Sequence, residues 1–289
     1  MKVLAILDDE IIENLFKKRY QKLLNNMDLE FGNLDEYYES EIRTGIYNLV
    51  ICDLDKNFND VLEFYQNTKT STKFLFVTDL EYIRYLKLLK DEKISNVYPK
   101  GLLIEDYMTS AKMIHNLSED NIFGIHNYVE YPIFLETINV HYSSEIKKLS
   151  LKINFLFPFL SKEKSMRIKL AFYEIASNAF FHSHSLEKGT EAFIKEPIYI
   201  SFAEDSEKII FSITDKKGTL DRDTVFYWLF KRFHEDESLP DNHGRGFFLM
   251  KNLVDNLIIN IDQEKMTEFI SIFYKHDYMG EKSLMIHQV

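Results

Sequence analysis

The sequence predicts an α/β protein of two domains, and two patterns support this prediction. In the first part of the chain, short apolar runs alternate with stretches of helical period, which is typical of a parallel sheet whose strands are joined by helices. In the second part, two helices are followed by a series of strands, which indicates an α/β sandwich that is not doubly wound. The length of 289 residues allows each domain a core of its own.

Residues 1–118 are predicted to form a doubly wound parallel sheet. Four strands are expected from apolar runs that are short and bounded by polar residues. They are Val3–Leu7, Leu49–Cys52, Phe74–Val77 and Val97–Tyr98. Helices are expected at Ile11–Asn25, Asn59–Thr68, Leu80–Lys90 and Ile104–Leu117, and residues 28–46 are expected to add a strand and a helix.

A connector is predicted at 119–133, where Gly124 and Pro132 interrupt the pattern. The second domain is predicted at 134–277, and residues 278–289 are predicted to be a C-terminal tail. Helices are expected at Ser143–Leu160 and Lys164–Ser185. The expected strands are Phe134–His141, Ile198–Ala203, Lys208–Thr214, Leu257–Asp262 and Glu268–His276.

Charge and apolar run length narrow the range of functions. The formal net charge of -11 argues against direct nucleic-acid binding, which needs clustered cations. No apolar run approaches the ~20 residues of a membrane helix. The apolar start of the chain ends at Asp8 and is too short for a signal peptide. We therefore expect a cytoplasmic protein with no membrane partner.

Polar residues follow the expected strands of the first domain. Asp8 and Asp9 end the first strand and Asp53 the third, Thr78 ends the fourth, and Lys100 follows the fifth. The carboxyl ends of parallel strands form a ligand crevice. Carboxylate oxygens are ligands that Mg²⁺ prefers, and a hydroxyl and an ammonium can neutralise a phosphoryl group.

This arrangement resembles the receiver domain of bacterial response regulators. The separations 53 − 9 = 44 (Asp9 to Asp53) and 100 − 78 = 22 (Thr78 to Lys100) are typical of that family. The resemblance implies that Asp53 is the phospho-acceptor, that Asp8 and Asp9 hold Mg²⁺ with it, and that Thr78 and Lys100 sense the phosphate. It also implies a cognate histidine kinase as partner.

The chain departs from the receiver pattern in two places. The separation 78 − 53 = 25 (Asp53 to Thr78) is several residues shorter than usual, and Pro99-Lys100 reverses the family's Lys-Pro order. The reversal leaves open where the lysine side chain points. Two alternatives remain, namely a receiver fold that is never phosphorylated and a doubly wound domain with chance acidic loop ends.

Two motifs stand out in the second domain. Glu174, Asn178 and His182 are spaced by four residues, which places them on one face of a helix. The turn His243-Gly244-Arg245-Gly246 opens a further expected helix, where backbone N–H groups can face phosphate. Together the two motifs suggest a site for ATP.

The region 134–275 resembles the GHKL ATPase fold, nearest to the bacterial anti-sigma serine kinases. The resemblance implies that Glu174 is the catalytic base, that Asn178 holds Mg²⁺, and that Asp215 accepts from the adenine amino group. The residues that it implies for nucleotide binding are Asn178, His182, Asp215, Gly218, Gly244, Arg245, Gly246 and Thr267.

One loop departs from that family. Where the family reads Asp-x-Gly-x-Gly, the chain reads Asp215-Lys216-Lys217-Gly218-Thr219. Two hypotheses follow for the output of a phosphorylation-controlled regulator. The domain is a serine/threonine kinase that uses ATP and Mg²⁺ on an anti-sigma antagonist, or a non-catalytic module that sequesters a sigma factor or its antagonist. The aromatic run Phe155–Phe159 leaves open a homodimer or a partner face.

Overall fold

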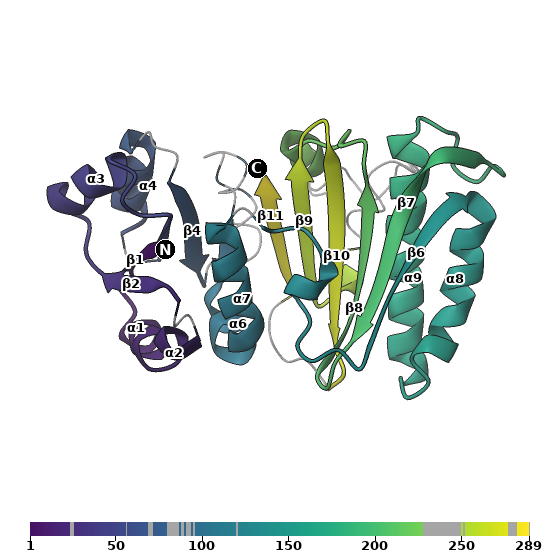
Figure 1. The fold of residues 1–289 in the computed structure, drawn as a ribbon, viewed down its shortest axis with the longest axis horizontal. Coiled ribbons are helices and arrows are strands. Elements are labelled where there is room, and N and C mark those ends of the chain that lie inside the picture. The colour runs from purple at the N-terminus through teal and green to yellow at the C-terminus, as the bar shows by residue number, and fades with distance from the viewer. Residues whose placement is uncertain are drawn as a thin grey trace, which may run out of the picture. The chain divides into compact units, whose positions relative to one another are not determined.

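The computed structural model describes residues 1–23, 26–55, 57–68, 72–79, 87, 90, 94, 96–119, 121–227, 250, 252–276 and 282–288. The chain divides into two compact units, Met1–Ile122 and Phe123–Val289. The first unit holds a five-stranded parallel sheet and the second a six-stranded mixed sheet, each with helices (Figure 1). The predicted α/β class is therefore confirmed.

The five strands of the first unit are all parallel, in the order β2-β1-β3-β4-β5. They are β1 (Lys2–Ile6), β2 (Asp28–Phe31), β3 (Leu49–Asp53), β4 (Lys73–Thr78) and β5 (Val97–Pro99). In the register, Asp53 lies beside Val77, and Thr78 lies beside Pro99. The last residues of β3, β4 and β5 therefore lie along one edge of the sheet. The strand order reverses at β1, which is where ligand crevices form in open α/β sheets.

Helices lie on both faces of this sheet, with α3 and α4 on one face and the others on the opposite face (Figure 1). They are α1 (Glu10–Leu15), a π-helix η1 (Phe16–Tyr20), α2 (Gln21–Leu23), α3 (Glu36–Arg43), α4 (Phe58–Asn67), α6 (Lys100–Glu105) and α7 (Tyr107–Ser118). The helix expected at Ile104–Leu117 is interrupted at Asp106, whose side chain accepts from Thr109 N and so caps α7. The helix expected at Leu80–Lys90 lies almost wholly outside the described residues.

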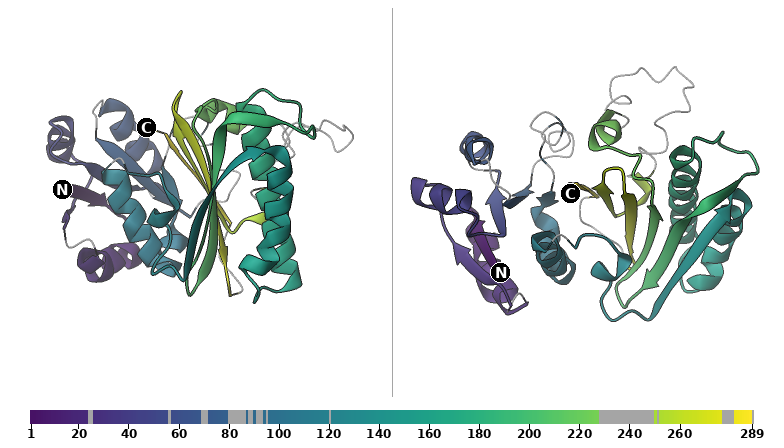
Figure 2. Two further views of the ribbon diagram at one scale, coloured as in Figure 1. Left: turned by 45° about the vertical axis from the view of Figure 1, so that its right-hand side comes forward. Right: turned by 45° about the horizontal axis from the view of Figure 1, so that its top comes forward.

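The second unit is a six-stranded sheet in the order β11-β9-β10-β8-β7-β6, antiparallel except for the β11–β9 pair. The strands are β6 (Phe134–Tyr142), β7 (Phe193–Glu204), β8 (Lys208–Asp215), β9 (Asn256–Asp262), β10 (Met266–Tyr274) and β11 (Ser283–Gln288). Helices α8 (Ser143–Leu156) and α9 (Lys162–Ser183) lie side by side on one face of this sheet (Figures 1 and 2).

Aromatic rings join α9 to the sheet. The Phe172 ring of α9 lies 5.3 Å from the Phe202 ring of β7 and 5.6 Å from the Phe211 ring of β8. All three side chains are fully buried, so this cluster forms part of the core of the second unit. Because alternate residues of a strand share a face, Ile213 and Asp215 lie on the same face of β8 as Phe211 and face the α9 layer.

Residues 123–130 pack against part of the opposite face of this sheet. The N–H of Gly124 donates to Glu268 Oε2 at 2.9 Å, and Asn260 Nδ2 donates to the same oxygen at 3.3 Å. Burial raises the pKa of the Glu268 carboxyl, and these hydrogen bonds partly offset that shift. The predicted connector 119–133 is corrected accordingly, because from Phe123 onward it belongs to the second unit.

The predicted C-terminal tail 278–289 also needs correction. Residues Ser283–Gln288 form β11, which pairs in parallel with β9. The side chains of Leu284, Met285 and Ile286 are buried. A run of three apolar residues is too short for its periodicity to identify a strand. The strand that β11 pairs with, β9, is also distant in the sequence, so no hairpin pattern indicates the pairing.

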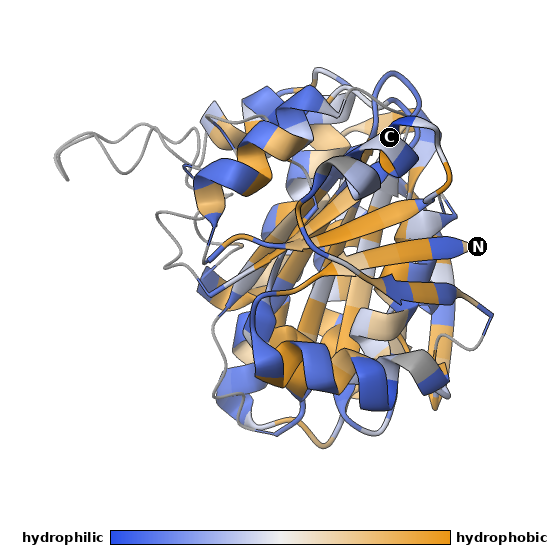
Figure 3. Cartoon of the chain, turned by 90° about the vertical axis from the view of Figure 1, so that its left-hand side faces the viewer, coloured by the Kyte–Doolittle hydropathy of each residue, from blue (hydrophilic) through white to orange (hydrophobic). Residues whose placement is uncertain are grey.

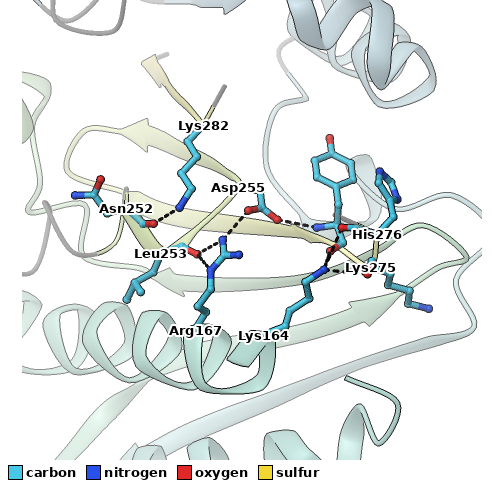
Figure 4. Close-up of polar contacts among 9 residues, drawn as sticks. Lys164, Arg167, Asn252, Leu253, Asp255, Lys275, His276 and Lys282 are labelled. Atoms are coloured by element: carbon cyan, nitrogen blue, oxygen red, sulfur yellow. Dashed lines mark hydrogen bonds and ion pairs between the residues drawn. The ribbon is translucent and has the colours of Figure 1, made fainter. Parts of the chain in front are cut away.

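A polar network holds the start of α9 to the strand ends at one end of this sheet (Figure 4). Lys164 Nζ donates to the carbonyl oxygens of Tyr274, Lys275 and His276 at 2.8, 2.9 and 3.0 Å. Arg167 donates to the Leu253 carbonyl and pairs with Asp255 Oδ1 at 2.7 Å. The network satisfies backbone carbonyls shortly before β9 and at the end of β10, and it ties the first turns of α9 to this end of the sheet.

Hydropathy follows these layers: strands carry long apolar stretches, and helices alternate polar and apolar faces (Figure 3). Among the described residues, none of the helices is long and apolar enough to cross a membrane. The thiol of Cys52 is fully buried within β3, and burial raises its pKa, which agrees with the structural role expected of a buried cysteine.

Replacing His287 of β11 with Gln is expected to reduce the loss of stability in acid. Burial lowers the pKa of the His287 imidazole from 6.5 to about 4. The unfolded chain therefore binds the proton more tightly, so the stabilisation is complete above pH ~6.5 and is lost as the pH falls towards 4. Urea unfolding between these values should show a slope smaller by up to about 1.4 kcal/mol per pH unit in His287→Gln. His276→Gln, with a side chain 58% exposed, is the control, and equal slopes in all three proteins would contradict the expectation.

Candidate functional site

The ends of β3 and β5 place Asp53 and Lys100 in contact. Lys100 Nζ lies 2.8 Å from Asp53 Oδ1, and both side chains are buried. Pro99 closes β5 with φ −65° and ψ 131°, so the chain stays extended until Lys100 begins α6. The reversed Pro99-Lys100 order therefore still directs the ammonium to Asp53. Burial alone would lower the pKa of Lys100, but together its contacts with the carboxylates raise that pKa.

Thr78 reaches the same cluster through Asp55, which was not among the predicted site residues. Thr78 Oγ1 donates to Asp55 Oδ1 at 2.5 Å, and Lys100 Nζ lies 2.5 Å from Asp55 Oδ2. The N–H of Asp79 also donates to Asp55 Oδ2, at 2.9 Å. Asp55 N in turn donates to Asp53 Oδ1 at 3.0 Å. The predicted phosphate sensors are therefore brought together, and a second carboxylate lies between them.

Asp8 and Asp9 both already accept hydrogen bonds. Asp9 Oδ1 caps α1 by accepting from Ile11 N at 2.8 Å and from Ile12 N at 3.2 Å, and Asp8 Oδ2 accepts from Asn57 Nδ2 at 3.1 Å. Within the described ranges, no group of three His, Cys, Asp or Glu residues is arranged to hold a metal ion.

One oxygen of the cluster fits a bound cation. Asp53 Oδ2 is buried and accepts no hydrogen bond from the described residues. A buried carboxylate oxygen without a donor is costly, and a hard cation such as Mg²⁺ would satisfy it. The Asp53 side chain therefore suits Mg²⁺, whereas Asp9 would have to leave its cap to join it.

In the second unit, Glu174 and Asn178 of α9 share one partner. Lys188 Nζ donates to Glu174 Oε2 at 3.0 Å and to Asn178 Oδ1 at 3.2 Å. The predicted grouping on one helix face is therefore present for these two residues, and His182 of the same helix is exposed. Sequence reasoning missed Lys188, which lies beyond the end of α9. The Lys188 ammonium therefore occupies the position beside Glu174 and Asn178 in which the sequence predicts Mg²⁺ and the phosphates of ATP.

Asp215 and Thr267 lie opposite each other at the end of the sheet, in register on β8 and β10. Asp215 is buried, and burial raises the pKa of its carboxyl. Its Oδ1 accepts from Lys217 N at 3.1 Å and from Gly218 N at 3.2 Å, which partly offsets that shift. Thr267 Oγ1 is buried and has no hydrogen-bond partner within the part of the chain that the structure describes. Both side chains are thus on the α9 side, where a polar ligand could satisfy the hydroxyl.

Gly218 is required by packing. Its φ is +56°, and a Cβ added there would lie 2.4 Å from Lys265 N and 2.8 Å from Asp262 O in the β9–β10 turn. The Gly218 carbonyl also accepts from Glu264 N at 3.0 Å. Gly218, which comes one residue later than the first glycine of the family's Asp-x-Gly-x-Gly pattern, therefore fixes the loop after β8 against the β9–β10 turn. Lys216 Nζ lies 4.4 Å from the centre of the Tyr199 ring.

The predicted residues Gly244, Arg245 and Gly246 lie outside the described residues. Of the predicted nucleotide-binding residues, the structure therefore describes those of α9, Asp215, Gly218 and Thr267.

No family model matches the sequence, and no curated protein matches it. Among solved structures, the chain is similar to one described as a trimeric coiled coil of yeast Spc42 fused to another structure, at 14% identity and a TM-score of 0.33. The match covers 55% of this chain and 94% of that chain. A TM-score at this level carries no information about the fold or the function of this chain.

Replacing Gly218 with Ala is expected to destabilise the second unit by about 3 kcal/mol, because a left-handed backbone and a close contact with backbone atoms add their costs. Gly189→Ala is the matched control, since Gly189 has φ +93° but nothing within 4 Å of an added Cβ. It should cost about 1 kcal/mol. Urea unfolding followed by circular dichroism measures both, and equal costs would contradict the packing role of Gly218.

Proposed function

We propose that the chain is a phosphorylation-controlled response regulator, with a receiver fold in the first unit and an anti-sigma-kinase-like GHKL module in the second. The contact of 2.8 Å between Lys100 Nζ and Asp53 Oδ1, at the edge where Thr78 also ends its strand, carries the proposal. The strand order and the edge position of all three residues support a receiver. A buried carboxylate beside a buried ammonium is suited to accepting a phosphoryl group.

In the proposed reaction, an oxygen of the Asp53 carboxylate attacks the phosphorus of a phosphohistidine on the cognate histidine kinase. The new P–O bond forms as the P–N bond breaks, and the electron pair leaves with the imidazole, which takes up a proton.

Mg²⁺ would be held by Asp53 together with Asp8 and Asp9, and it would neutralise charge on the transferred phosphoryl oxygens. Lys100 then provides the fixed positive charge of the site, and the Thr78 hydroxyl provides a neutral donor. The added charge of the phosphoryl group redistributes these contacts, and this change is the signal passed on from the first unit.

For the second unit we propose an ATP-binding module that acts on a sigma factor or an anti-sigma antagonist. Glu174 would act as general base and Asn178 would hold Mg²⁺. The buried Asp215 carboxyl and the Thr267 hydroxyl, which lie in register on the α9 side of the sheet, support a polar ligand there. Their place at the sheet end agrees with a GHKL-type nucleotide site.

A second candidate function is a non-catalytic partner-binding module, and one observation favours it. Lys188 already contacts both Glu174 and Asn178, and the loop after β8 already uses Asp215 Oδ1. With these groups engaged, the unit would bind its protein partner without using ATP, as a monomer or as a homodimer.

Acetyl phosphate is expected to label Asp53. The carboxylate attacks phosphorus and acetate leaves, which gives an acyl phosphate that is stable in acid and cleaved by hydroxylamine. Labelling should fall to background in Asp53→Asn and persist in Asp60→Asn, since Asp60 is an exposed carboxylate of the first turn of α4. Radiolabel retained in Asp53→Asn would exclude Asp53 as the acceptor.

Titration with ATP and Mg²⁺ in a calorimeter is expected to give saturable heat, and Asn178→Ala should weaken binding at least tenfold, because it removes the proposed oxygen ligand of the metal. Asn139→Ala is the control, since Asn139 is exposed on β6. An absence of heat at millimolar ATP would reject the ATP site and leave the non-catalytic module.

A further inference from the structure

Three donors from two segments converge on the Asp55 carboxylate. The Thr78 hydroxyl donates to Oδ1 at 2.5 Å, the N–H of Asp79 donates to Oδ2 at 2.9 Å, and Lys100 Nζ lies 2.5 Å from Oδ2. A hydroxyl, a backbone amide and an ammonium together make a strong site for a small anion, because both oxygens of one carboxylate are satisfied at once.

The Asp55 carboxylate and its donors differ in how deeply they are buried. Thr78 and Lys100 are buried at the sheet edge, and the Lys100 side chain is 5% exposed. The Asp55 side chain is 22% exposed and lies just after β3, outside any strand or helix. Rotation of the Asp55 side chain alone would therefore move its carboxylate away from the donors, while the donors keep the positions that β4 and α6 give them.

Lys100 does not need Asp55 for charge pairing. Asp53 already lies 2.8 Å from the same ammonium, so one buried carboxylate neutralises the buried cation. Asp55 adds a second negative charge to a cluster that also contains Asp79, and repulsion among these carboxylates opposes its presence. The contacts with Thr78, the Asp79 amide and Lys100 must compensate for this repulsion, which indicates that the three donors favour an anion strongly.

We propose that Thr78, the Asp79 amide and Lys100 form an anion site that the chain fills with its own Asp55 carboxylate. Asp55 occupies the position that an external phosphate-like anion would take, and it competes with that anion. The identification of the natural competitor as a phosphoryl group on Asp53 rests on the proposed function; the site itself does not. A phosphoryl group carries more charge and three acceptor oxygens, so it can displace the carboxylate.

Inorganic phosphate tests the site without covalent chemistry. Its affinity is measured by calorimetry, and its position by the chemical shift of the Asp79 amide in the full-length protein. Asp55→Ala is expected to bind phosphate at least tenfold more tightly than the unaltered chain, with a shift at the Asp79 amide. Asp60→Ala, which removes the same charge from the exposed first turn of α4, should bind as the unaltered chain does.

Two further variants make the outcome decisive. Asp55→Asn keeps the size of the side chain and removes its charge, so it serves if Asp55→Ala does not fold, and it should also gain affinity. Adding Thr78→Val to either variant should cancel the gain. A folded Asp55 variant with no gain in phosphate affinity, or an equal gain in Asp60→Ala, would overturn the proposal.

Labelling by acetyl phosphate separates this proposal from the proposed function. Tighter phosphate binding without any label on Asp53 would support the anion site and reject Asp53 as an acceptor. Labelling of Asp53 at the same rate with and without Asp55, together with unchanged phosphate affinity, would reject the anion site and keep the acceptor. Faster labelling in Asp55→Asn would support both.

Discussion

The pairing of the buried Lys100 ammonium with carboxylates is the interaction on which the edge of the first sheet, where β3, β4 and β5 end, depends. A charge buried to this degree costs several kcal/mol unless it is paired and hydrogen-bonded. Asp53 at the end of β3 and Asp55 just beyond it provide that pairing, while Lys100 itself opens α6. One cation therefore joins two segments of the chain, and Thr78 of β4 joins them as a third through Asp55.

The positions of the edge residues could be predicted, because parallel strands that end in polar residues bring those residues to one edge. The direction of the Lys100 side chain could not, since it depends on Pro99 remaining extended at the end of β5. Asp55 lies two residues after Asp53, and an extended chain would place both on one side. Its contact with Thr78 depends on how the loops after β3 and β4 approach each other, and local sequence does not encode that distance.

In the second unit as well, features that a local sequence pattern determines could be predicted, and contacts between residues distant in the sequence could not. The spacing of Glu174 and Asn178 predicts their common helix face, but Lys188 reaches them from beyond the end of α9. Nothing local in residues 123–130 indicates that they cover Glu268, because the hydrogen bond from Gly124 joins residues 144 apart in sequence. Strand β11 was missed for the same reason, since its partner β9 determines its structure.

Both candidate sites already contain a partner from the chain itself, and the two partners differ in strength. A ligand must displace this partner, so its apparent affinity falls by the fraction of molecules in which the site is open. Lys188 is 43% exposed, and an exposed pair of this kind contributes about 0.2–1 kcal/mol, which is less than a tenfold effect. Asp55 instead contacts a buried ammonium, a hydroxyl and a backbone amide, and hydrogen bonds to charged groups are worth about 1.5–3 kcal/mol. Internal competition is therefore weak at Glu174 and strong beside Asp53, so a ligand that displaces Asp55 must overcome a larger free-energy cost than one that displaces Lys188.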